Sequence, residues 1–168
     1  TKYIYPGKEF AYSTSLNFDH KQLLYASVNV SPKLGIFRPR WGFYYKQQFF
    51  DTRKYGASKA LSRPLLLCLL DNNFALSETM NAAISLNAAT PNADGFLMMK
   101  SNYSVDLRFD KSFANRTWII YLSANDIFKT TKERWTMYGQ GSGTMKDCYN
   151  YTRSISLQVT YNFNAKRS

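Results

Sequence analysis

The residues of this chain that could carry out chemistry do not form a catalytic or metal-binding pattern. The single histidine, His20, follows Asp19 in a predicted tight turn, with no Ser or Cys at the spacing of a nucleophile. Cys68 and Cys148 lie far apart, and neither has a His or a second Cys at metal-ligand spacing. We therefore expect no catalytic residue, no cofactor and no metal site.

Two further patterns resemble active-site elements only superficially. Asp106 and Asp110 share one face of a predicted strand, but Arg108 stands between them on that face. This spacing predicts a charge-balanced ladder that faces water, and not an acid–base pair. The glycine-rich segment 139–143 precedes neither a helical pattern nor a Lys-Ser/Thr pair, so we expect an external loop and not a phosphate cradle.

The chain is strongly basic. Its 168 residues contain 22 Lys and Arg against 11 Asp and Glu, a net charge of +11 that suits contact with nucleic acid, with anionic lipid or with transported anions. Aromatic residues run from Tyr3 to Phe163, whereas base-stacking platforms would be concentrated on one or two strands. The main feature that would suit nucleic acid is the basic stretch Lys46, Arg53, Lys54, Lys59 and Arg63. We predict that Arg53, Lys54, Lys59 and Arg63 form a solvated external basic loop, with contact to the phosphates of anionic lipid as an alternative.

These side chains must be positioned by β-strands, because period-two alternation dominates the chain. In residues 154–163, Ser, Gln, Thr and Asn alternate with Ile, Leu, Val, Tyr and Phe. No helix can present that pattern. The predicted strands are 9–18, 22–32, 36–50, 63–73, 79–89, 101–111, 117–127 and 153–163.

The lengths of the strands and of their connections suit a membrane barrel. A strand core of about 10 residues, tilted by about 45°, spans roughly 23 Å, close to the apolar band of about 25 Å in outer-membrane barrels. Short turns near residues 34–35, 75–78 and 112–116 alternate with long links at 51–62, 90–100 and 128–152. The short link at 19–21 breaks this alternation.

A soluble β-sandwich would alternate too, but its strands are shorter and it needs a long crossover. The longest apolar run, 65–70, is far shorter than a transmembrane helix requires. We predict an all-β fold: an antiparallel up-and-down meander of about eight transmembrane strands, part of a larger outer-membrane β-barrel. Neither a signal peptide nor a plug precedes the strands, so we expect residues 1–168 to be a single barrel segment.

The C-terminal motifs resemble the end of the outer-membrane β-barrel family found in TonB-dependent receptors of Bacteroidetes. They are Ala-Asn-Asp-Ile-Phe at 124–128, Arg-Trp-Thr-Met-Tyr at 134–138 and the alternating strand 153–163. Tyr-Lys-Gln-Gln-Phe at 45–49 and Asp-Asn-Asn-Phe-Ala-Leu at 71–76 are similar too. The resemblance implies a C-terminal fragment of a larger barrel in the Gram-negative outer membrane.

The resemblance also implies a function and partners. The whole protein would import a nutrient, with a plug domain coupled to the TonB system. Tyr161 and Phe163 would form the signal read by the barrel-assembly machinery, although residues 164–168 follow that signal here. Expected partners are outer-membrane lipid, lipopolysaccharide, the rest of the barrel and the plug, with no nucleic acid. The alternatives are a free-standing eight-stranded barrel that anchors or adheres, and a soluble basic β-protein that binds nucleic acid.

Overall fold

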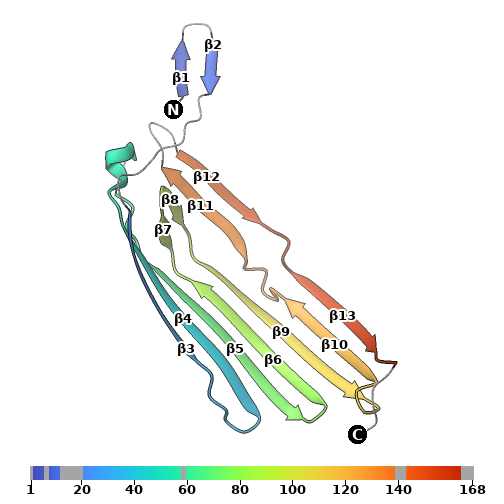
Figure 1. The fold of residues 1–168 in the computed structure, drawn as a ribbon. Coiled ribbons are helices and arrows are strands. Elements are labelled where there is room, and N and C mark those ends of the chain that lie inside the picture. The colour runs from blue at the N-terminus through green and yellow to red at the C-terminus, as the bar shows by residue number, and fades with distance from the viewer. Residues whose placement is uncertain (1, 6–7, 12–20, 58–59, 139–142, 164–168) are drawn as a thin grey trace.

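The computed structural model describes residues 2–5, 8–11, 21–57, 60–138 and 143–163 (Figure 1). Apart from one short 3-10 helix, η1 (Thr52–Tyr55), its regular structure is antiparallel β. The strands are β1 (Lys2–Tyr5), β2 (Lys8–Ala11), β3 (Gln22–Val30), β4 (Phe37–Phe49), β5 (Leu65–Ser77), β6 (Met80–Ala89), β7 (Asn92–Asp94), β8 (Leu97–Met99), β9 (Asn102–Phe113), β10 (Trp118–Asn125), β11 (Lys132–Tyr138), β12 (Gly143–Tyr149) and β13 (Ser154–Tyr161). Within the described ranges, no helix is long and apolar enough to cross a bilayer.

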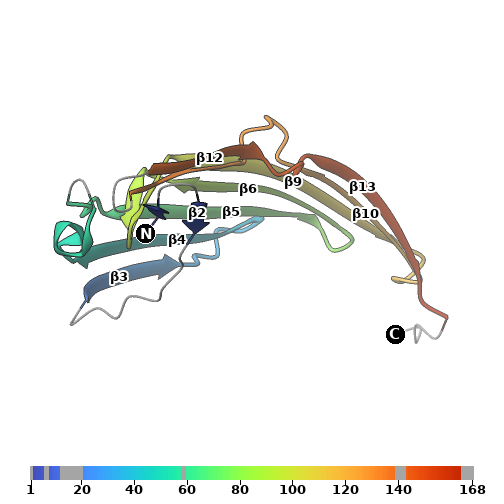
Figure 2. The same cartoon turned by 90° about the horizontal axis from the view of Figure 1, so that it is seen from above.

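Seven strands form the main sheet, in the order β3-β4-β5-β6-β9-β10-β13. Each strand pairs antiparallel with its neighbours, as in β3 with β4 and β10 with β13. Figure 2 shows that the sheet bends into an open arc, with β3 and β13 at its two ends. The predicted antiparallel meander is confirmed, and the strands expected between residues 22 and 163 all take part in it.

The first expected strand, 9–18, has a different partner from the one predicted. Its beginning belongs to β2, which pairs with β1 in a separate two-stranded sheet. Pro-Gly at residues 6–7 is a dipeptide that favours a tight turn, which accounts for this local pairing. Residues 12–18, together with Asp19 and His20, lie outside the described residues.

The long links predicted at 90–100 and 128–152 are long connections, and they contain four further strands that were not predicted. β7 and β8 form a hairpin through Gly95, whose φ of 58° suits glycine, and β11 and β12 form a second hairpin. Because β8 also pairs with β11, the two hairpins form a four-stranded sheet beyond the main one. β7 and β8 have three residues each, too few for an alternation to be recognised, and the seven residues of β11 and of β12 do not alternate strictly between apolar and polar types.

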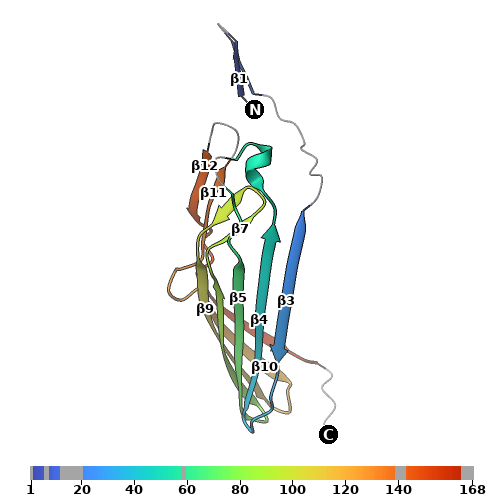
Figure 3. The ribbon, with the colours of Figure 1, turned by 90° about the vertical axis from the view of Figure 1, so that its left-hand side faces the viewer.

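The two ends of the main sheet differ, as Figure 3 shows. At one end the connections are the short turns 31–36, 78–79 and 114–117. At the other end lie η1 and the four-stranded sheet. This difference is the predicted one between short turns and long connections, and in outer-membrane barrels the long connections lie outside the cell.

The strand register separates an apolar face from a polar face. Phe43 pairs with Cys68, which pairs with Ala88, and Ala88 pairs with Tyr103, so these four residues share one face. One step along the strands, Asn87 pairs with Ser104 on the opposite face. The sheet has little buried core of its own: the buried apolar residues of the described chain are Phe50, Ala57, Leu61, Ala83 and Ala93, most of them at the end with the long connections.

Candidate functional site

The polar face carries a ladder of side-chain hydrogen bonds between neighbouring strands. Most members are short Ser and Asn side chains, which suits a wall that faces water or another polar surface. The bonds run from Tyr44 Oη to Asn29 Oδ1 (3.0 Å), Ser85 Oγ to Asp71 Oδ1 (2.6 Å), Asn87 Nδ2 to Ser104 Oγ (3.2 Å), Asn81 Nδ2 to Asp110 Oδ2 (2.7 Å) and Asn125 Nδ2 to Ser154 Oγ (3.0 Å). Ser123 and Ser156 hydroxyls lie 2.6 Å apart in the same ladder.

The charged residues of this face are distributed among separate partners. Arg108 Nη2 donates to Asn73 Oδ1 at 3.2 Å, whereas Asp110 accepts from Asn81. Asp106 accepts the backbone N–H of Asp126 at 2.7 Å. Asp106 and Asp110 therefore do not converge on one site, and the arrangement favours the predicted charge-balanced ladder.

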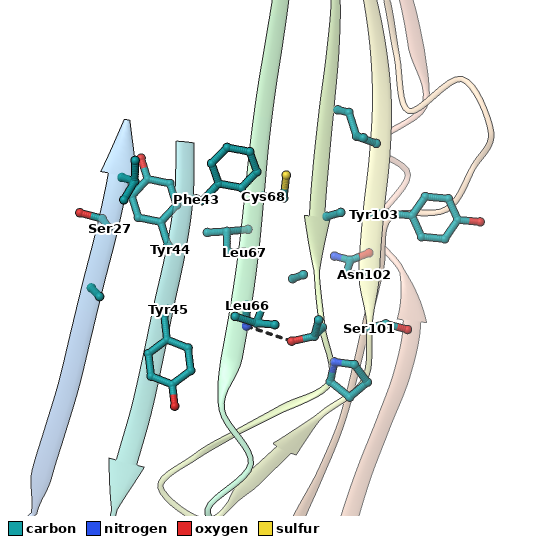
Figure 4. Close-up of a pocket in the computed structure, with 17 residues that line it drawn as sticks. Ser27, Phe43, Tyr44, Tyr45, Leu66, Leu67, Cys68, Ser101, Asn102 and Tyr103 are labelled. Carbon is teal, nitrogen blue, oxygen red and sulfur yellow. Dashed lines mark hydrogen bonds between the residues drawn. The ribbon is translucent and has the colours of Figure 1, made fainter. Parts of the chain in front are cut away.

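The apolar face exposes side chains that a soluble sheet would bury. Exposed fractions are 60% for Val28, 46% for Phe43, 44% for Leu122 and 67% for Leu157. Figure 4 shows Phe43, Cys68 and Tyr103, from β4, β5 and β9, around a hollow of about 750 Å³ on this face. An exposed apolar face of this extent requires an apolar solvent or a covering partner.

A polar group on the apolar face is satisfied within the face. Pro39 is the third residue of β4 and has no N–H for the ladder, and Asn72 is its partner on β5. Trp41 Nε1 donates to Asn72 Oδ1 at 3.0 Å, and Asn72 Nδ2 donates to the carbonyl of Ile84 at 3.4 Å. The amide of Asn72 therefore does not remain unpaired in an apolar environment.

The basic loop is a folded junction and not only a solvated segment. Gln48 is 1% exposed; its Nε2 donates to the carbonyl of Leu61 at 2.7 Å, and its Oε1 accepts the N–H of Gly95 at 2.8 Å. Leu61 is fully buried, and its N–H donates to Thr52 Oγ1. The side chain of Gln48 thus joins the segment around η1 to the β7–β8 turn, a role that sequence alternation does not reveal.

The predicted basic residues have different surroundings in this junction. Arg53 Nε is paired with Asp51 at 3.0 Å, and its hydrogen bond lowers the pKa of Asp51. Lys54 and Arg63 are exposed, while Lys59 lies outside the described residues. Arg53 is therefore neutralised locally, whereas Lys54 and Arg63 remain exposed cations.

Two lysines converge on a carboxylate beside the junction. Lys46 Nζ lies 2.9 Å from Asp94 Oδ2, and Lys21 Nζ lies 3.2 Å from Asp94 Oδ1. The hydrogen bond from Lys46 holds the pKa of Asp94 below its ordinary value, with Lys21 adding to the effect. On β11, Glu133 is paired with Lys146 at 2.6 Å, which lowers the pKa of Glu133 and raises that of Lys146.

Asp126, in the Ala-Asn-Asp-Ile-Phe motif, clamps the connection between β10 and β11. It is 1% exposed and accepts the backbone N–H of Thr130 at 2.8 Å and the hydroxyl of Thr152 at 2.7 Å. Burial alone would raise the pKa of Asp126, but the hydrogen bonds from Thr152, Thr130 and Thr131 together lower it to about 2. The motif therefore contains a structural anchor that sequence reasoning had not assigned.

The predicted assembly-signal residues lie at the turn end of the apolar face. Tyr161 pairs with Trp118 across β13 and β10, with ring centroids 4.5 Å apart. Phe163 is 85% exposed, and its ring centroid lies 4.6 Å from that of Tyr161. This aromatic group suits an interfacial girdle and leaves Phe163 accessible to a partner.

Residues 3–161 match the model of the outer membrane protein beta-barrel family, so the match spans nearly the whole chain. No match was found among curated proteins or among solved structures.

Proposed function

Because the chain belongs to the outer membrane protein beta-barrel family and is located in the cell outer membrane, we propose that it forms the C-terminal barrel wall of a larger TonB-dependent transporter. In this proposal the apolar face contacts lipid, and the polar face lines the lumen or contacts a plug domain. The end with η1 and the four-stranded sheet is the extracellular one, because long connections lie there.

The observation that supports this proposal most is that, among the described residues, the main sheet ends at β3 on one side and at β13 on the other. In hydrocarbon, every backbone N–H and C=O must be hydrogen-bonded, so membrane-spanning sheets close into barrels. A sheet with seven strands in an open arc needs further strands on both edges. We infer that these strands come from the rest of a larger barrel.

The side chains of the polar face also support a wide lumen. A barrel of about eight strands is filled by its own side chains. Ser85, Ser104, Ser123 and Ser156 are too short to fill such an interior, and their hydroxyls are used between neighbouring strands. This favours the transporter over the free-standing small barrel. Location in the outer membrane leaves the soluble nucleic-acid-binding alternative without support.

The aromatic C-terminus supports a role in assembly as part of the same proposal. Tyr161 and Phe163 stand at the end of an exposed alternating strand, where the barrel-assembly machinery would bind before the barrel closes. Nutrient import, the TonB partner and an origin in Bacteroidetes follow from the resemblance and belong to this proposal. We do not propose an enzymatic activity for this chain.

The test is an immunoblot of outer membranes, boiled and unboiled, with an antibody against residues 154–163. A boiled band several-fold heavier than 19.4 kDa that migrates faster when unboiled would support the large barrel. A band near 19.4 kDa in that fraction would indicate a free-standing small barrel and contradict the transporter proposal.

A further inference from the structure

We propose that the extracellular end of the apolar face binds a phosphorylated, acylated glycolipid of the outer leaflet. The acyl chain would occupy the hollow between β3 and β9, and the phosphates would contact a group of cations above it. We call this group the outer basic face: Lys100, Lys129, Lys132 and Arg134. The proposal rests on the outer-membrane location and on the extracellular orientation of this end, and it does not require transport.

The strand pairing places these cations on one side of the four-stranded sheet. Lys132 and Arg134 are two residues apart on β11, so they share a face. The N–H of Lys100 donates to the carbonyl of Arg134 at 2.9 Å, which places Lys100 directly opposite Arg134. Lys129 Nζ lies 5.2 Å from the ring centroid of Tyr149, the partner of Lys132 on β12.

The guanidinium group of Arg134 reaches the rim of the apolar hollow. Arg134 Nη2 donates to the carbonyl of Ser101 at 2.7 Å, and Ser101 is part of that rim. Glu133, the residue before Arg134, lies on the opposite side of β11. The outer basic face therefore stands beside the hollow, at the end with the long connections.

Few carboxylates neutralise the cations of the outer basic face. Within the described residues, none of the four forms an ion pair, whereas Lys146 on the opposite side is paired with Glu133 at 2.6 Å. Arg134 Nε is buried without a hydrogen-bond partner among those residues. Asp147, opposite Arg134 on β12, is the carboxylate on the same side. Four cations against one carboxylate suit a ligand with more than one phosphate.

The hollow below is shaped for an apolar chain. The small residues Cys68 and Ala88 lie between the larger Phe43 and Tyr103, and Ala26 lies beyond Phe43 on β3. These residues line a hollow of about 750 Å³ (Figure 4). Lipid-anchoring sites elsewhere combine apolar contact with cations that hold the headgroup. The junction of such a hollow with the outer basic face favours an anionic lipid over a protein partner.

The test compares full-length proteins purified from outer membranes for binding of lipid A with two phosphates, measured by native mass spectrometry. The variant K100Q/K132Q/R134Q should bind about a hundredfold more weakly, since each cation near an anionic lipid contributes roughly fivefold. The matched control, K33Q/R38Q/R116Q, removes the same charge from exposed positions at the end with the short turns and should change binding less than twofold. Equal losses in the two variants would overturn the proposal.

Two measurements on the unsubstituted protein keep the test decisive if a variant does not fold. Dephosphorylated lipid A should bind at least tenfold more weakly than the form with two phosphates, and equal binding would refute the phosphate contacts. The phosphorylated headgroup sugar without acyl chains should also bind at least tenfold more weakly. If it binds as tightly as the lipid, the hollow plays no part and the proposal fails. None of these outcomes depends on whether the barrel transports a nutrient.

Discussion

Replacing the Asp126 carboxylate should weaken the connection between β10 and β11. In D126N the side chain keeps its shape, and Asn tolerates the left-handed backbone of this position, whose φ is 46°. The negative charge is lost, and one of the two oxygens that accept hydrogen bonds from Thr130, Thr131 and Thr152 becomes an NH2 donor. The substitution therefore keeps the size of the side chain and removes the charge together with one acceptor of the clamp.

The magnitude follows from the lowered pKa of Asp126. Each pKa unit corresponds to about 1.4 kcal/mol, so the interval between 3.8 and about 2 gives roughly 2 kcal/mol. Because the folded pKa is lower than the unfolded one, this stabilisation is present above about pH 4 and is lost as the pH falls towards 2. We expect D126A to cost about 3 kcal/mol, since its donors lose their acceptor altogether.

The assay is urea unfolding of the protein in lipid vesicles, together with hydrogen exchange of the amides of Thr130 and Thr131. At pH 7 the unfolding midpoint of D126N should be lower than that of the unsubstituted protein, and both amides should exchange faster. Glu78 is exposed in the β5–β6 turn and provides the control E78Q, which should change neither the unfolding midpoint nor the exchange rates of the two amides. If the difference between D126N and the unsubstituted protein is the same at pH 7 and pH 2, the clamp does not act through its charge.

Three further substitutions test other parts of the fold. G42A should lower the free energy of unfolding by about 2 kcal/mol, because the added Cβ would lie 2.8 Å from Tyr44 Cε2 and 2.9 Å from Asn29 Oδ1. G143A is the control, since its Cβ would have its nearest contact at 3.5 Å. Equal midpoints of urea unfolding for the two variants would contradict this packing. Q48L should open the junction and loosen the backbone around the exposed Lys54, so that trypsin cleaves there at least tenfold faster; unchanged cleavage would show that the junction does not depend on Gln48. F163A should lower the amount of folded barrel in the outer membrane several-fold without altering the unfolding midpoint, whereas an altered midpoint with normal amounts would assign Phe163 to the girdle alone.

The strands of the main sheet could be predicted because apolar and polar residues alternate over many positions in each strand. The two faces of the sheet require different solvents, and this requirement maintains the alternation. A shift of one residue would turn Leu122 and Leu157 to the polar face and Ser123 and Ser156 to the apolar one, so the pattern fixes both strand and register. The polar ladder around Asp106, Arg108 and Asp110 could be predicted for the same reason.

The connections could not be predicted in the same way, because their structure depends on contacts between distant residues. β7 and β8 have three residues each, and their pairing is stabilised by β11 and by Gln48, which lies 47 positions before Gly95. Asp126 looks like an ordinary turn residue until Thr152 is placed beside it. The outer basic face was missed because Lys100 and Arg134 meet only after β8 pairs with β11.

The composition of the polar ladder has a consequence for the electric field inside the barrel. Along this wall Arg108 alternates with Asp106 and Asp110, and Arg40 lies 3.5 Å from Asp71. Balanced charges of this kind cancel over a few ångströms, so in the proposed barrel, in which this face lines the lumen, the wall would give a solute no sustained gradient of potential. The excess positive charge of the chain would then act at the strand ends and loops, where it would attract anions to the mouth of the proposed barrel.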